Sequence, residues 1–84
     1  MNFIKFYNFV QNELDVYYSF SKVKDKKIEE LNISHSEIDL FLNKLEFAYD
    51  IEVYEGPITL HMRFGDLVYE LFRQITENEH SIAE

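Results

Sequence analysis

The spacing of apolar residues after Ser34 constrains the fold more than any other feature of this chain. Large apolar side chains recur there at three- and four-residue intervals, at Ile38, Phe41, Leu42, Leu45 and Tyr49. At about 100° per residue these positions fall within one arc roughly 100° wide, so they form a single buried stripe on a helix. Ser34 followed by Glu37 matches the S-x-x-E capping box, in which each side chain satisfies a free backbone N–H group. The pattern predicts a helix that begins after Ser34 and ends near Ala48 or Tyr49.

Two further stripes lie at the two ends of the chain. The first predicts a helix from about Asn2 to Leu14, with Tyr17 as its outer limit; it consists of Phe3, Ile4, Phe6, Tyr7, Val10 and Leu14. The second predicts a last helix; it consists of Phe64, Leu67, Val68, Leu71, Phe72 and Ile75. Apolar content then falls, so we expect residues 75–84 to form a frayed tail.

The segments between these stripes differ in length. The connection Asp15–Ile33 is long for a loop, which indicates that it packs against the core; its expected anchors are Val16, Phe20, Val23, Ile28 and Leu31. Ile28–Leu31 is expected to form a helical turn within it, and its lysine cluster is expected to be a solvated surface. Gly56 and Pro57 favour a short third helix or a turn over Pro57–His61.

Helical segments with one apolar face each must bury those faces against one another, which predicts an all-α, small four-helix bundle. Because the chain has 84 residues, we expect a single domain over residues 1–84.

The residues Leu31–Ser36, together with Leu45–Val53, resemble the centre of an acyl carrier protein. That family typically reads D-L-G-x-D-S-L, a helix, and then L-E-x-x-F-x-I-x-I, and the distance between the two halves matches without a gap. Phe64–Leu71 resembles the family's closing T-V-G-D-L-V-x-x-I, with Arg63 at the place of the usual capping threonine. The resemblance implies an acyl-carrier-protein-like bundle with a long loop between helices 1 and 2 and a short third helix.

The resemblance also places the family's attachment site for 4'-phosphopantetheine. The serine that bears this arm falls on His35, and the hydroxyls of Ser34 and Ser36 lie one residue out of register. Ser34 is interpreted as a helix cap. Ser36 is the remaining candidate for cofactor attachment if the register slips by one residue. On this register we expect no arm, and therefore no cofactor.

The central helix is also the predicted partner-binding surface. Carrier proteins dock through acidic residues of this helix, and the predicted docking acids here are Glu37, Glu46 and Asp50, with Asp39 added in this chain. Leu40 and Phe47 lie within about 20° of each other on the side opposite the buried stripe. They form a partner surface, or they are ordinary exposed apolar residues, or the connection Asp15–Ile33 covers them.

Composition excludes several classes of function. Sixteen acidic against eight basic residues give a net charge of −8, which disfavours nucleic acid as a partner. No apolar run approaches the roughly 20 residues of a membrane span, and no signal peptide is recognisable, so a cytoplasmic protein is expected. With no cysteine and no ligand spacing among His35, His61 and His80, no metal site is predicted. We also expect no enzymatic activity, because no catalytic arrangement is legible.

Two functional hypotheses follow. The first is an acyl carrier protein, or a protein derived from one, in fatty-acid or polyketide-type metabolism, which docks to basic surfaces of acyl-handling enzymes. The second is a protein-interaction or regulatory module that uses Leu40 and Phe47. The acyl group, the partner and the oligomeric state cannot be read from the residues.

Overall fold

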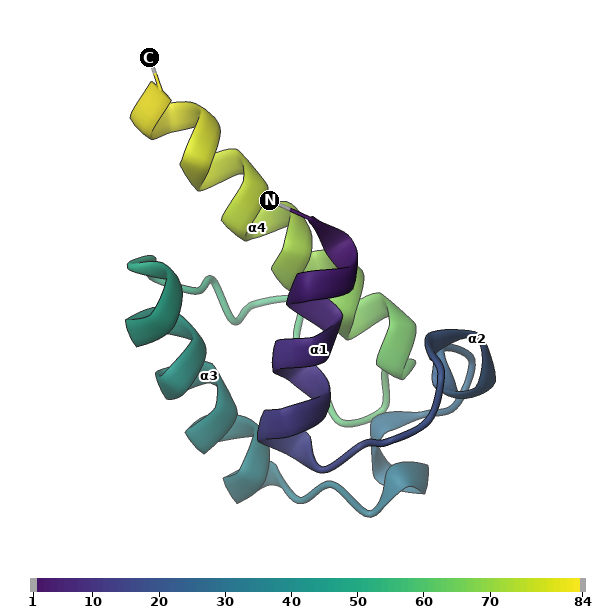
Figure 1. Ribbon diagram of the computed structural model, residues 1–84. Coiled ribbons are helices and arrows are strands. Elements are labelled where there is room, and N and C mark those ends of the chain that lie inside the picture. Colours follow the sequence, from purple (N-terminus) through teal and green to yellow (C-terminus); the bar gives the residue numbers. More distant parts are fainter. Residues whose placement is uncertain (1, 84) are drawn as a thin grey trace.

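The chain folds into three long helices and two short helical turns. The computed structural model describes residues 2–83, with side chains described to residue 78. Figure 1 shows the elements in chain order: α1 (Phe3–Leu14), α2 (Phe20–Val23), the 3₁₀ turn η1 (Ile28–Leu31), α3 (His35–Tyr49) and α4 (Phe64–Ala83). The described residues contain no β-strand, and one isolated bridge joins Lys27 to Arg63. The prediction of an all-α fold is therefore confirmed.

The three long helices bury the stripes that the sequence predicts. α1 lies between α3 and α4 and contacts both, while α2 packs against α4 (Figure 1). Phe6, Phe41 and Phe64 are each at most 1% exposed, and they bring one large ring from each long helix into the core. Partly buried rings extend this core, with Phe3 against Phe72 and Phe9 against Tyr49 in edge-to-face contacts.

Local side-chain chemistry sets the ends of α1 and α3. Asn2 caps α1, since its Oδ1 accepts a hydrogen bond from the Ile4 amide at 2.7 Å. α1 ends at Leu14 because Asp15 turns into the left-handed region at φ 56°, and Asp50 ends α3 in the same way at φ 54°. Aspartate tolerates this conformation better than most residues.

The connection between α1 and α3 packs as predicted. Val16, Val23 and Ile28 are buried, and Phe20 and Leu31 are partly buried against the core. The predicted helical turn is η1, and the additional short helix α2 precedes it.

Of the short third helix or turn predicted over Pro57–His61, the structure shows the turn and not the helix. This segment forms turns, closed by hydrogen bonds from the Ile58 amide to the Glu55 carbonyl and from the Met62 amide to the Thr59 carbonyl. Its side chains alternate between half-buried and exposed from Ile58 to Met62, which does not follow the spacing of a helix. The one short α-helix of the described chain is α2, which lies before α3.

α4 continues to Ala83, so the described backbone of residues 75–83 is helical; Glu84 lies outside the described residues, and the frayed tail stays a prediction. Ile75 is buried at 1% exposure, which ties the fourth turn of α4 to the core. Arg73 donates to both Glu70 and Glu77 at helical spacing. Burial raises the pKa of Glu70, but hydrogen bonds from Gln74 and Arg73 outweigh it, and the pKa falls below its usual value.

Backbone carbonyls of the lysine-rich segment, Lys22–Lys27, cap the start of α4. The Phe64 amide donates to the Lys26 carbonyl at 2.7 Å, and the Gly65 amide donates to the Lys24 carbonyl at 2.9 Å. The Ile28 amide in turn donates to the Met62 carbonyl at 3.1 Å. These bonds satisfy amide groups that a helix start leaves free. They replace the side-chain cap that Arg63 cannot supply.

Candidate functional site: the outer face of α3

The start of α3 holds Ser36, the candidate for cofactor attachment, together with Ser34 and His35. Ser34 forms the predicted capping box: its Oγ accepts from the Glu37 amide at 3.1 Å, and its own amide donates to Glu37 Oε1 at 3.3 Å. His35 Nδ1 lies 3.2 Å from Asp39 Oδ2, and both side chains are more than half exposed. Ser36 is exposed on the first turn of the helix. The Ser34 hydroxyl is thus engaged by the cap.

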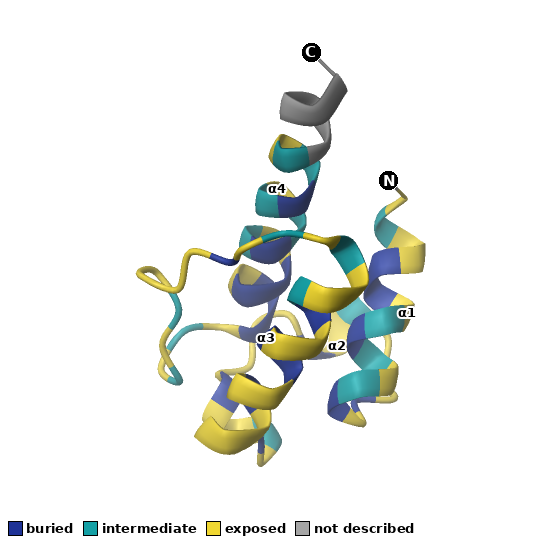
Figure 2. Ribbon diagram, turned by 90° about the vertical axis from the view of Figure 1, so that its left-hand side faces the viewer, coloured by how far each residue is buried: buried dark blue, intermediate teal, exposed yellow. Residues whose placement is uncertain are grey.

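The side of α3 that faces away from the core is an open ridge, which we call the outer ridge. At about 100° per residue its members span about 60°; they are Ser36, Leu40, Asn43 and Phe47. Leu40 is 57% exposed and Phe47 is 92% exposed. Figure 2 views the molecule from the α3 side and shows broad exposed bands along this helix.

The connection Asp15–Ile33 does not cover the outer ridge, which excludes the covered-patch interpretation of Leu40 and Phe47. This connection runs past the far side of α1, and α3 lies at the other edge of the fold (Figure 1). Next to the ridge, Lys44 Nζ lies 3.2 Å from Glu13 Oε2 on α1. The ridge is therefore an exposed apolar feature beside an ion pair that ties α3 to α1.

The four predicted docking acids have different local roles. Glu37 closes the capping box and Asp39 pairs with His35, and both lie on the exposed surface. Glu46 is half-buried, and its Oε2 accepts from the Val53 amide at 2.8 Å, which holds the segment leaving α3 against the helix. Asp50 is the left-handed residue at the helix end. Glu37 and Asp39 thus flank the outer ridge, whereas Glu46 and Asp50 shape the end of α3.

The pocket at the start of α3 is small. The pocket beside His35 has a volume of about 40 Å³, and its walls include Asp39 and Thr59. Ligand pockets in proteins are typically about 300–1,000 Å³. Among the described residues, no group of three or more metal-ligating side chains is close enough to hold an ion. None of the described helices combines the length and apolar content that crossing a membrane requires.

Comparison with known protein families, curated proteins and solved structures gives no match.

Proposed function

We propose that this protein is a carrier-derived binding domain, which docks to partner proteins through the outer ridge of α3. The observation that carries the proposal is the exposure of Leu40 and Phe47, at 57% and 92%, on a helix face that the described fold leaves open. Burying one large apolar side chain contributes about 1.5–3 kcal/mol. Large rings near the centre of an interface are often the residues on which affinity depends most.

Charge indicates the chemistry of the partner. The chain carries a net charge of −8, and Glu37 and Asp39 flank the outer ridge. Such a surface complements an apolar pocket with a basic rim, and charge of this kind mainly increases the rate of encounter. By its resemblance to acyl carrier proteins, the partner class is the acyl-handling enzymes.

The alignment with the acyl-carrier-protein pattern supports a domain that bears no phosphopantetheine arm. The arm requires a hydroxyl at an exposed helix start, where backbone amides favour a phosphate. This position holds His35, the Ser34 hydroxyl serves the cap, and Ser36 remains as the exposed hydroxyl. We infer that the protein carries no resident cofactor and binds as a folded surface.

A second candidate function is an interaction or regulatory module with no carrier ancestry. The same exposed ridge would serve it, and a second copy of the chain could be its partner. The two candidate functions share the docking surface. They differ in whether the start of α3 derives from a site that accepts a phosphopantetheine arm.

The double variant Leu40→Glu/Phe47→Glu tests the docking surface. We expect it to lose partner proteins that the parent retains in affinity capture from its source cells, because two carboxylates replace the apolar centre of the ridge. Its helical circular dichroism should persist, since both side chains are exposed. Sedimentation of the parent and the variant measures self-association in the same way.

The matched control is Ile4→Glu/Tyr17→Glu, which adds the same charge at apolar side chains that are 69% and 67% exposed on other elements. This control should retain the parent's partners. If all three proteins retain the same partners and the same self-association, the outer ridge is not the interface.

A further inference from the structure

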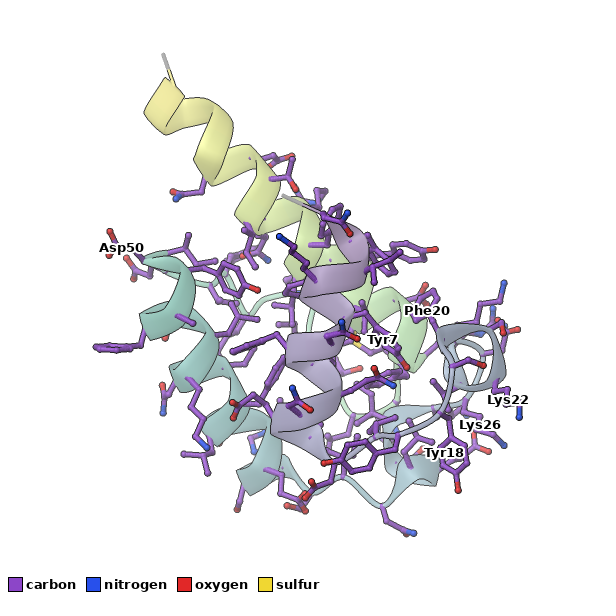
Figure 3. All side chains as sticks on the ribbon, in the orientation of Figure 1. Tyr7, Tyr18, Phe20, Lys22, Lys26 and Asp50 are labelled. Carbon is purple, nitrogen blue, oxygen red and sulfur yellow. The ribbon has the colours of Figure 1, made fainter. Side chains whose placement is uncertain are left out.

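A pocket with basic walls lies on the other side of the molecule from the outer ridge. Figure 3 shows Tyr18, Lys22 and Lys26 close together at one edge, and Asp50, at the end of α3, at the opposite edge. The pocket has a volume of about 410 Å³, within the range of about 300–1,000 Å³ that is typical of ligand pockets. Its lining consists of Tyr18, Lys22, Val23, Lys26, Glu30 and Leu31.

The walls of this pocket are held by hydrogen bonds within the fold. The Tyr18 carbonyl accepts from two groups of α1, the Tyr7 hydroxyl and Gln11 Nε2, each at 3.0 Å. Burial raises the pKa of Tyr7 above its ordinary value, which already leaves the hydroxyl protonated as a donor at neutral pH. Lys26 is fixed at its backbone, because its amide donates to the Val23 carbonyl and its carbonyl accepts from Phe64. The pocket is therefore preformed.

The pocket combines two lysine side chains with an apolar floor. No acidic side chain among residues 2–78 lies within ion-pair distance of Lys22 or Lys26. The one acid in the lining is Glu30, and its Oε1 accepts from the Lys27 amide at 2.9 Å. Val23 is 2% exposed and Leu31 is half-buried, so the floor is apolar.

We propose that this pocket binds a small amphipathic anion, a carboxylate or a phosphate monoester with a short apolar tail. The head group lies between the ammonium groups of Lys22 and Lys26, and the tail lies against Val23, Leu31 and the Tyr18 ring. A charge-assisted hydrogen bond is about twice as strong as a neutral one, so the two lysines favour an anion over a neutral molecule of the same shape. This site is independent of the docking surface on α3.

Titration with octanoate, octyl phosphate and octanol tests the site, followed by calorimetry and by NMR of the Val23 and Leu31 methyl groups. At least one anion should bind and shift both methyl signals, and octanol should bind at least about tenfold more weakly. Preference for octanoate or for octyl phosphate identifies the head group. If neither anion binds, or if octanol binds as tightly, the proposal is wrong.

Two double variants, each of which removes two positive charges, test where the head group binds. Lys22→Gln/Lys26→Gln should weaken binding of the anion at least about tenfold, because both ammonium groups are lost. Lys24→Gln/Lys27→Gln removes two lysines of the same segment that do not line the pocket, and it should change binding less than about twofold. Equal weakening in both variants would mean that the anion responds to the overall charge, and it would overturn the proposed site.

Discussion

Phe64→Ala is expected to lower the free energy of unfolding by about 3–5 kcal/mol, as large-to-small core substitutions of aromatic residues do. Phe64 is fully buried at the first turn of α4, where its ring packs edge-on to Tyr7 on α1. The substitution therefore leaves a cavity where α1, α4 and the lysine-rich segment meet. At about 0.05–0.15 kcal/mol per residue, a domain of this size has a total stability of only about 4–13 kcal/mol, so the loss removes much of it.

Urea denaturation followed by circular dichroism measures this loss, and Phe47→Ala is the matched control. The same change of side chain at a position 92% exposed should alter the free energy of unfolding by no more than about 0.5 kcal/mol. Similar losses at Phe47 and Phe64 would contradict the assignment of core and surface on which the docking proposal depends.

Gly65→Ala is expected to destabilise the protein by about 1–3 kcal/mol, in the range of overpacking substitutions. A Cβ at Gly65 would lie 2.8 Å from the Lys24 carbonyl oxygen and 2.9 Å from the Lys24 Cβ. Alanine would favour the helix by up to about 1 kcal/mol over glycine. The clash outweighs this gain because it is with backbone, and relieving it displaces the carbonyls that cap α4.

Gly56→Ala is the control for this experiment. A Cβ at Gly56 would meet the ring of Tyr54, whose exposed side chain can rotate away. Thermal unfolding should give a lower midpoint for Gly65→Ala and a nearly unchanged one for Gly56→Ala. A midpoint for Gly65→Ala at or above that of the parent would mean that α4 does not start in close contact with Lys24.

The sequence predicted the elements whose signals are local. The capping box at Ser34 and Glu37 and the stripe that includes Phe41 and Leu45 located α3, because side-chain chemistry and helical periodicity determine a helix independently of the rest of the fold. The outward position of Leu40 and Phe47 followed from the same periodicity. Whether another segment covered them depended on the path of the connection Asp15–Ile33, which periodicity does not determine.

The remaining features depend on backbone contacts between distant segments, which leave no pattern in side-chain type. The backbone carbonyls of Lys24 and Lys26 cap α4, so the side chain of Arg63 does not indicate where this helix begins. The hydrogen bond from the Val53 amide to the Glu46 carboxylate also could not be predicted, because the sequence shows Glu46 only as an acidic residue on a helix. Between Pro57 and His61, a short helix and a turn compete. Half-burial of every second residue, at Ile58, Leu60 and Met62, does not follow helical spacing, and the segment forms turns.

The most direct test of the carrier-derived proposal is the intact mass of two proteins after incubation with a phosphopantetheinyl transferase and coenzyme A. The parent should keep its mass, because His35 stands where the resemblance to acyl carrier proteins places the attachment serine. His35→Ser should gain one phosphopantetheinyl group, with an established carrier protein as positive control. Modification of the parent would contradict the absence of an arm. An unchanged mass for both proteins, beside a modified control, would contradict a carrier-type start of α3.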